Sequence, residues 1–439
     1  MASSSTALLR LAKIAGLVPE PSSCAAQSLV TIALSAQGVL SKENSLPVHW
    51  YFRNARPTFE WRDGGMAGKS QHGTILYVGG FALPDGNAAA QRVVANARLF
   101  AKIGYKIAFL NYSKEVITPR KTEYFGFECF ECPDAEWRIA SRLDIDRIKE
   151  IVSERSDIKY VIAYNYPAPS LSRLIKLCRE RGIKCFGDVT EWYRARDVSL
   201  VKMPLKYIDT VIRMKWLHPK MDGLIVISEY LRSYYGGCVP TLLLPPMVDA
   251  DDDKWRPIDE SEFGVVKFVY AGKPSKTKER LDLIVDAVVS LPVDFKVRLD
   301  IVEVTAEEFS KVYGHSVSSR RVVFHGRVPH EDAVGFVKQA DYSVIVRDDN
   351  LVTRAGFPSK FAESISCGTP VICNDNSDLK IWVEKYGCGF VVEKDSLTAE
   401  FACILKQPKP SFDVRIFDYR NFRPQAADFF NSIDGNKEN

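Results

Sequence analysis

The chain has 439 residues, which is more than one hydrophobic core usually supports, so two domains are expected. Its apolar content of 46% and charged content of 26% are those of an ordinary soluble globular protein. The formal net charge of +4 is too small at this length to favour nucleic acid, and no basic stripe interleaved with aromatic residues is visible. The sequence therefore predicts a two-domain soluble protein with no nucleic-acid partner.

The ten cysteines are scattered and mostly lie in apolar stretches, which is typical of core residues in a reducing compartment. Cys129 and Cys132 have the spacing of a zinc-binding pair, but no second pair or nearby histidine completes a ligand set. His325 and His330 lie close together without a carboxylate pattern that would make them a metal site. We therefore expect no metal site, no cofactor and a cytoplasmic protein.

Residues 1–70 form an N-terminal extension with the least regular pattern in the chain. Leu8, Leu11, Ala15 and Val18 fall on one helical face with two cations beside it. A helix on a lipid surface, which would give a peripheral contact at the inner face of the membrane, is one interpretation. The first nineteen residues are also Ser-rich and lack acids, as in a cleaved targeting peptide. The favoured interpretation is an extra helical layer or a poorly ordered leader.

After this extension the pattern becomes strand, loop and helix. Residues 74–80 predict a buried strand that ends in two glycines, and a long amphipathic helix follows the loop 81–90. These glycines lie at the carboxyl end of the first strand, where ligands bind in open α/β sheets. Gly80 and Gly86 would let another backbone or a ligand approach closely. The G-x-G-x-x-G fingerprint of dinucleotide-binding proteins is absent.

The same alternation of apolar strands and amphipathic helices continues to residue 249. Parallel sheets need such continuous apolar strands between crossover helices. The polar segment 249–257, rich in structure-breaking residues, is interpreted as a linker. Before it we expect strands over 105–112, 160–166, 183–189, 223–228 and 241–249, with helices over 142–153, 170–181 and 228–235.

A second series with the same rhythm begins at Val265. Its first strand ends in Gly272 and is followed by a basic loop, 273–280. Two similar α/β domains facing each other across a cleft are the simplest arrangement of two such series. The further strands expected here are 295–303, 322–326, 342–346 and 370–373, and the last helix is 424–433.

The segment 354–374 has the most informative local pattern. After a turn at Gly356 and Phe357, a helix begins at Pro358 or Ser359, and Gly368 closes it. The start of a helix presents unpaired N–H groups and a partial positive charge, which together favour an anion.

Two side chains of this helix add to the prediction. Lys360 lies in the first turn, where a purely structural helix would favour an acid. Glu363 lies one turn further on and can accept hydrogen bonds from two hydroxyls. A phosphate next to a diol describes a nucleotide. The alternative is an ordinary helix that covers an α/β unit.

The residues resemble the retaining GT-B glycosyltransferases of glycosyltransferase family 4, the glycosyl transferases group 1, over about residues 75–430. The resemblance rests on YVGGFALPDGNAAAQRVVANARLFAKIGYKI, DGLIVISEYL, YAGKPSKTKERLDLIVDA, VVFHGRV and GFPSKFAESISCGTPVI. It implies a GT-B fold with two Rossmann-like domains. An acceptor-binding domain would comprise 71–248 and a crossover helix in 416–439, and a nucleotide-sugar-binding domain would comprise 249–415.

The resemblance also implies roles for single residues of the second domain. Lys273 and Lys278 match a basic pair that grips the donor diphosphate, and such cations can stabilise the charge on a departing nucleoside diphosphate. Val328 matches the position whose backbone contacts the base. Glu363 matches the second glutamate of the family's Glu-x7-Glu motif, which holds the ribose hydroxyls. The first glutamate of that motif is replaced here by Ala355.

Further contacts follow from the same comparison. Arg354 and Lys360 would take over part of the sugar and phosphate contacts, and backbone N–H groups of Gly356 and Phe357, next to Ser359, would bind phosphate. In the first domain the loop from Gly80 to Asn87, including Gly86, would lie over the transferred sugar. Arg92 would contact the phosphate or the acceptor. Asp188 and Glu191 lie in a loop of this domain, where a catalytic role and a helix cap are both open.

The predicted activity is transfer of a hexosyl group from a nucleoside-diphosphate sugar to an acceptor hydroxyl, with retention at the anomeric carbon. The acceptor would be a glycan, a lipid-linked compound or a small molecule in polysaccharide or glycoconjugate biosynthesis. No Asp-x-Asp motif is needed, so metal independence is expected. The alternatives are an epimerase or phosphorylase of the same fold, or a non-catalytic binding or scaffold protein.

Overall fold

The computed structural model describes residues 72–84, 87–133, 142–192, 203–258, 264–273, 275 and 278–435. The predictions for residues 1–70 and for Gly86 lie outside these residues. Within them, no helix combines the length and apolar character that a membrane crossing requires.

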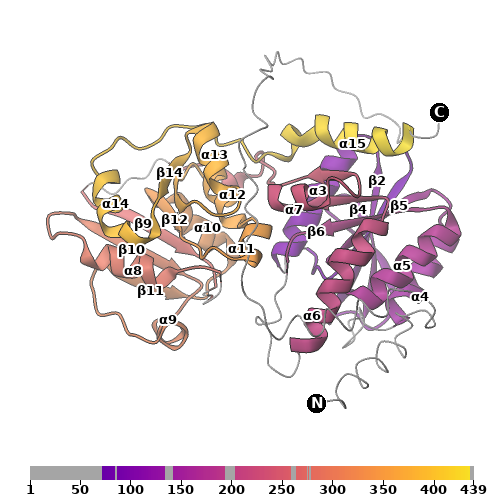
Figure 1. Cartoon of the computed structure of the whole chain (residues 1–439), viewed down its shortest axis with the longest axis horizontal. Helices are drawn as coiled ribbons and strands as arrows, with labels where there is room; N and C mark the ends of the chain where they lie inside the picture. Colours follow the sequence, from indigo (N-terminus) through magenta and orange to yellow (C-terminus); the bar gives the residue numbers. More distant parts are fainter. Residues whose placement is uncertain are drawn as a thin grey trace. The chain divides into compact units, whose positions relative to one another are not determined.

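The first lobe is built on an eight-stranded sheet with the order β3-β4-β2-β1-β5-β6-β7-β8 (Figure 1). All neighbouring strands are parallel except β3 and β4, which form an antiparallel hairpin. The strands are β1 (Thr74–Gly79), β2 (Lys106–Ser113), β3 (Arg120–Tyr124), β4 (Phe127–Pro133), β5 (Ile158–Tyr164), β6 (Lys184–Val189), β7 (Gly223–Val226) and β8 (Thr241–Leu243).

The sequence did not predict the β3–β4 hairpin. Strand β3 reads RKTEY and has no buried residue, so it lacks an apolar signal. The pair Cys129 and Cys132 lies in β4, where both side chains are free thiols in the buried core, in agreement with a structural role.

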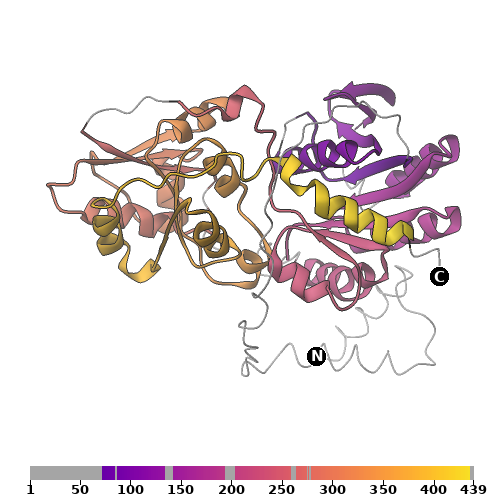
Figure 2. The ribbon, with the colours of Figure 1, turned by 90° about the horizontal axis from the view of Figure 1, so that it is seen from above.

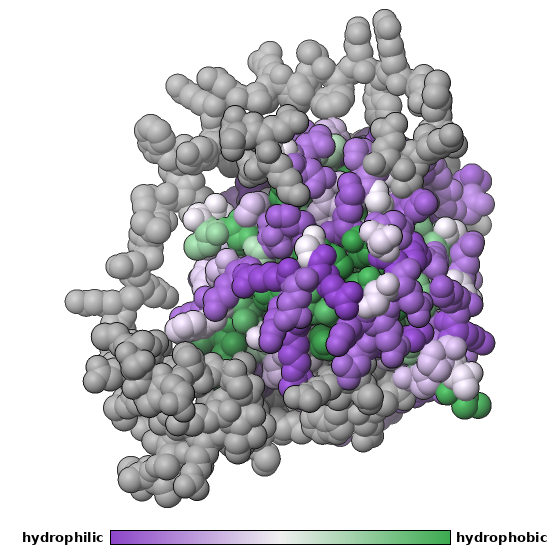
Figure 3. Space-filling view, turned by 90° about the vertical axis from the view of Figure 1, so that its right-hand side faces the viewer, coloured by the Kyte–Doolittle hydropathy of each residue, from purple (hydrophilic) through white to green (hydrophobic). Residues whose placement is uncertain are grey.

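Helices cover both faces of the first sheet. Helices α3 (Ala88–Lys102) and α15 (Arg423–Gly435) share one apolar core, and α4 (Arg142–Glu154) and α5 (Ala168–Arg181) share the other. On the visible side of this lobe, hydrophilic side chains predominate, with hydrophobic ones between them (Figure 3). Two further helices of the lobe are α6 (Met203–Ile212) and α7 (Glu229–Tyr235).

The last helix lies along the first lobe in both ribbon views (Figure 2). Phe430 of α15 contacts the rings of Phe100, Tyr105 and Tyr160, with centroid distances of 5.2, 4.8 and 5.3 Å. The C-terminal segment therefore leaves the second lobe and completes the core of the first.

The second lobe is a six-stranded, fully parallel sheet with the order β11-β10-β9-β12-β13-β14. The strands are β9 (Val266–Ala271), β10 (Val297–Val302), β11 (Val322–Gly326), β12 (Tyr342–Ile345), β13 (Val371–Asn374) and β14 (Gly389–Val392). The helices are α8 (Leu281–Ser290), α9 (Ala306–Tyr313), α10 (His330–Lys338), α11 (Leu351–Ala355), α12 (Ser359–Ser366), α13 (Leu379–Tyr386) and α14 (Leu397–Ile404).

Both sheets are doubly wound, and each has a point where the strand order reverses. The reversal lies between β1 and β5 in the first lobe and between β9 and β12 in the second. Ligands of open α/β sheets bind beyond the carboxyl ends of the strands at such points. The loops after β1, β5, β9 and β12 are therefore where a binding site is expected.

The two lobes are joined by apolar packing and by buried polar contacts. Ser228, at the start of α7, donates a hydrogen bond of 2.7 Å to the carbonyl oxygen of Ala355. The next residue, Glu229, donates its backbone N–H to Oδ2 of Asp378 at 2.9 Å. One apolar core includes Val226 and Leu231 of the first lobe and Phe357 of the second. The lobes therefore share buried apolar packing beside these two hydrogen bonds.

The contact at Asp378 makes the stability of the protein depend on pH. Burial raises the pKa of Asp378 to about 7, because it disfavours the charged carboxylate. Between about pH 4 and 7 the unfolded chain releases this proton while the folded protein retains it, so this group lowers the free energy of unfolding as pH rises. The slope is at most about 1.4 kcal/mol per pH unit, and the effect is constant above the folded-state pKa.

We expect Asp378→Asn to remove this part of the pH dependence. Urea unfolding of both proteins between pH 4 and 8 would measure it, and the free-energy difference between them should change most between pH 4 and 7. Parallel profiles over that range would contradict the assignment.

Candidate functional site

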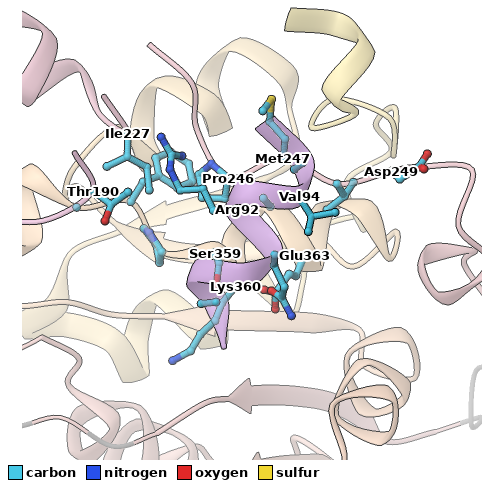
Figure 4. A pocket seen from close by; sticks show the side chains of 18 of the residues that line it. Arg92, Val94, Thr190, Ile227, Pro246, Met247, Asp249, Ser359, Lys360 and Glu363 are labelled. Carbon is cyan, nitrogen blue, oxygen red and sulfur yellow. The ribbon is translucent and has the colours of Figure 1, made fainter. Parts of the chain in front are cut away.

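A cavity of about 550 Å³ lies where the carboxyl ends of the two sheets approach each other. Arg92 and Val94 of α3, and Ser359, Lys360 and Glu363 of α12, lie around it (Figure 4). Its other polar lining residues include Gln91, Thr190, Glu191, Asp249, Lys278, Glu279 and Arg347. A ligand in this cavity would therefore contact both lobes.

Helix α12 has the anion-binding features that the sequence predicts. It begins at Ser359, and the preceding Pro358 offers no side-chain cap. The N–H groups of Ser359 and Lys360 donate to no atom of the described residues, whereas Phe361 already donates to the carbonyl of Pro358. Two unpaired donors and the positive end of the helix dipole therefore face the cavity.

Glu363 lies one turn along the same helix and lines the cavity. Within the described part of the chain its carboxylate takes part in no hydrogen bond or ion pair. A carboxylate can accept hydrogen bonds at both oxygens. Glu363 is therefore available to a pair of hydroxyls next to the start of α12.

Lys360 is fixed within a buried polar cluster. Its Nζ lies 3.0 Å from Oε2 of Glu279 and 3.2 Å from the hydroxyl of Tyr270, which itself donates to the same Oε2 at 2.7 Å. Gly272 leaves the space for this arrangement, because a Cβ at that position would overlap the end of the Lys360 side chain. The glycine at the end of β9 thus lets a lysine reach from α12 to the loop after β9.

Replacing Gly272 by alanine should displace Lys360 from Glu279. Gly272 has φ of +146°, and the added methyl group would overlap Lys360, so we expect a loss of about 1–3 kcal/mol in the free energy of unfolding. Gly314→Ala is the matched control, because Gly314 also has positive φ but has nothing within 4 Å of an added Cβ. Urea unfolding would compare them, and equal losses in both variants would contradict the steric argument.

The two lysines of the predicted basic pair occupy different environments. Lys278 lines the cavity, and its Nζ lies 3.4 Å from Oε1 of Glu191, which belongs to the first lobe. Lys273 is exposed and is not among the residues that line the cavity; its carbonyl accepts a bond from Tyr270. The structure thus brings Lys278 into the site, whereas the contact expected for Lys273 is absent from this arrangement. Glu191 pairs with Lys278, and the residues after Trp192, where a helix capped by Glu191 would begin, lie outside the described residues.

Arg92 lines the cavity, but its guanidinium is already occupied. It is bound to Asp188, with Nε 2.9 Å from Oδ1, and its Nη1 donates to the carbonyl of Leu244 at 2.9 Å. Tyr77 and Asn96 also donate to Oδ2 of Asp188 at 2.5 and 3.1 Å. Burial, followed by the charge of Asp188, raises the pKa of Tyr77 well above its usual value.

This network gives both side chains a structural position. The Arg92 side chain supports the core of the first lobe, because its charge is balanced by a buried carboxylate, and its contact with a phosphate or an acceptor stays a prediction. The Asp188 side chain has no exposed surface and is bound within this network.

Three other predicted residues make local contacts in the structure. The N–H of Gly356 donates to the carbonyl of Val352 at 3.1 Å as α11 ends. Arg354 is not among the residues that line the cavity and forms an exposed ion pair with Asp349 at 2.5 Å. The N–H of Val328 donates to Oε1 of Glu303 at 3.4 Å, and Val328 does not line the cavity.

The remaining predicted residues have mainly structural positions. Asn87 caps α3 by accepting the N–H of Ala90 at 2.8 Å. Gly80 is exposed, whereas the preceding Gly79 makes the close backbone approach, because a Cβ there would meet Tyr164. Phe357 lines the cavity with a buried ring that packs on Phe361 and Trp382, and its N–H donates to no described atom.

Among the charged cavity residues that sequence reasoning missed, Glu279 and Arg347 are the most buried. Only 8% and 4% of their surfaces are exposed. Glu279 follows Lys278 in a highly charged loop, and Arg347 directly follows an apolar strand. A charge directly after a buried strand, at the reversal point of the sheet, was the signal that could have indicated Arg347.

Comparison with solved structures defines the class. Sucrose-phosphate synthase (tll1590) from Thermosynechococcus elongatus is similar over 83% of this chain and 100% of its own, with a TM-score of 0.63 and 14% identity. Alr3699/HepE from Anabaena, in complex with UDP-glucose, is similar over 82% of this chain and 100% of its own, with a TM-score of 0.55 and 12% identity. Trehalose-6-phosphate synthase OtsA is similar over 83% of this chain and 96% of its own, with a TM-score of 0.54 and 10% identity. The chain has the GT-B fold.

A separate comparison concerns the family. Residues 266–407, which form most of the second lobe, match the family model described as Glycosyl transferases group 1. This match agrees with the resemblance predicted from the sequence, and the solved structures confirm the predicted GT-B fold. No curated protein sequence matches the chain.

Proposed function

We propose that the protein is a glycosyltransferase that moves a sugar from a nucleoside-diphosphate sugar to an acceptor hydroxyl. The observation that carries the proposal is the arrangement on α12, where unpaired N–H groups and Lys360 precede the unpartnered carboxylate of Glu363. A diphosphate at the helix start and a ribose at Glu363 would satisfy these groups together. The group 1 match over this segment supports the same assignment.

The mechanism would depend on stabilising the leaving group. The bond between the anomeric carbon and the diphosphate breaks, a bond to the acceptor oxygen forms, and the acceptor proton is released. Negative charge develops on the diphosphate, where Lys278 and the N–H groups of α12 would stabilise it, while the sugar passes through an oxocarbenium-like state. We propose retention at the anomeric carbon and a hexosyl donor, with a glycan, lipid-linked or small-molecule acceptor. The metal independence and the cytoplasmic location stay predictions.

Calorimetry with UDP, GDP and their sugars tests the proposal directly. Alr3699/HepE was solved with UDP and with UDP-glucose, so this nucleotide is the first probe. Binding followed by nucleotide release in the presence of an acceptor would support transfer. Isomerisation without an acceptor would favour an epimerase, and binding without any turnover would favour a scaffold protein, which the alanine at position 355 makes a specific alternative. No binding to any nucleotide would reject the proposal.

A further inference from the structure

The replacement of the family's first glutamate by Ala355 leaves a gap in the proposed site. Ala355 has no exposed surface, and its carbonyl accepts a hydrogen bond from Ser228 of the other lobe at 2.7 Å. This position is therefore closed by the contact between the lobes. A carboxylate that binds the transferred sugar has to come from another element.

Glu279 has the features such a carboxylate needs. It lines the cavity from the loop after β9, although only 8% of its surface is exposed. Its Oε2 accepts hydrogen bonds from Tyr270 and Lys360, but its Oε1 accepts none from the described residues. Because Glu279 lines the cavity, this unused oxygen is available to a hydroxyl donor of a ligand.

The surroundings keep Glu279 charged and in place. Burial alone would raise its pKa, but the charges of Lys360 and Arg347 and the hydroxyl of Tyr270 outweigh it and lower the pKa. Arg347 is itself fixed, because its Nη1 donates to the carbonyl of Thr353 at 3.3 Å. Such a preorganised carboxylate binds a neutral hydroxyl at little cost in reorganisation.

The position of Glu279 relative to the other groups fits the sugar. Along α12, Glu363 lies one turn beyond Lys360, and Lys360 reaches back to Glu279. The residue before Glu279 is Lys278, which bridges to Glu191 of the first lobe. Lys360 therefore connects α12, which carries Glu363, to Glu279, and the residue next to Glu279 contacts the first lobe.

We propose that Glu279 binds hydroxyl groups of the transferred sugar through Oε1 and replaces the missing carboxylate of position 355. The inference rests on the proposed function and adds the residue that selects the donor sugar. Tyr270, Lys360 and Arg347 act as positioning residues for it.

The test compares binding of UDP with binding of UDP-glucose, and of GDP with GDP-mannose, to the full chain by calorimetry. With whichever nucleotide the wild type binds, Glu279→Gln should weaken binding of the nucleotide sugar about tenfold or more and leave the nucleoside diphosphate within about twofold. A donor whose sugar lacks one hydroxyl should lose affinity for the wild type but not for Glu279→Gln, if that hydroxyl is the partner.

Two variants keep the result interpretable. Asp300→Asn is the matched control, because Asp300 is a carboxylate of similar burial in the same lobe that is paired through Oδ1 with Arg298 and His325 and is not among the residues that line the cavity. Tyr270→Phe keeps the carboxylate but removes one of its supports, so it should affect the sugar nucleotide less than Glu279→Gln. An equal loss for nucleotide and nucleotide sugar in Glu279→Gln would overturn the inference, since Glu279 would then only position Lys360. Absence of nucleotide binding in the wild type would instead reject the proposed function.

Discussion

Replacing Lys278 by alanine should lower the rate of sugar transfer about 10²–10³-fold, on the scale of losing one donor that stabilises a developing anion. Lys278 lines the cavity and forms an ion pair with Glu191 across the two lobes at 3.4 Å. Its charge is therefore within reach of a diphosphate at the start of α12. Initial rates of nucleotide release from the donor, with and without acceptor, would measure the change.

Lys184→Ala is the matched control for this experiment. Lys184 forms an ion pair with Asp222 at 3.2 Å. The two lysine side chains are 42% and 38% exposed in Lys184 and Lys278, and the carboxylate partner of each is 32% exposed. Because Lys184 is remote from the cavity lining, its replacement should leave the rate within about twofold. A change below threefold in Lys278→Ala would count against the assignment of this lysine to the leaving group.

The rate of the Lys273→Ala variant distinguishes the role that the resemblance implies for Lys273 from the one that the structure indicates. The resemblance gives Lys273 and Lys278 equal roles, whereas the structure places Lys273 outside the cavity lining and leaves it exposed. A much smaller rate loss for Lys273→Ala than for Lys278→Ala would therefore agree with the structure.

The sequence was sufficient to predict the fold because its signal is local. Continuous apolar strands alternate with amphipathic helices, and this pattern holds for most of the parallel strands of both sheets. The elements it missed have weak local signals. Strand β3 is polar along its length, and β14 (Gly389–Val392) is only four residues long and mostly half-buried.

The site was predictable only where its chemistry lies within one segment. The turn, helix start and side chains at 356–363 are neighbours in the chain, so their relation to an anion and a diol could be inferred from spacing. The pairing of Arg92 could not be inferred, because its partner, Asp188, lies 96 residues away. Glu279 was missed for the same reason, since Lys360 meets it from a distance of 81 residues. Pairing between distant segments decides whether a charged residue is free to bind a ligand.

Replacing Asp188 by alanine should destabilise the first lobe by about 3–5 kcal/mol, which is the cost of leaving a buried charge without its partner. Asp188 is completely buried and accepts hydrogen bonds from Tyr77, Arg92 and Asn96. Its removal leaves the Arg92 guanidinium, of which only 6% is exposed, without a counter-charge beside the cavity. Urea unfolding followed by circular dichroism would measure the loss.

The comparison with an exposed pair separates this explanation from a general effect of losing an ion pair. Lys176 and Glu180 lie on one face of α5 with exposures of 79% and 59%, so Glu180→Ala should change the free energy of unfolding by less than about 0.5 kcal/mol. The double variant Arg92→Met, Asp188→Ala should recover part of the stability, because no unpaired charge is then buried. If the single variant Asp188→Ala lost no more than Glu180→Ala, Arg92 would have another way to satisfy its charge, and a ligand-binding role for Arg92 would become the better interpretation.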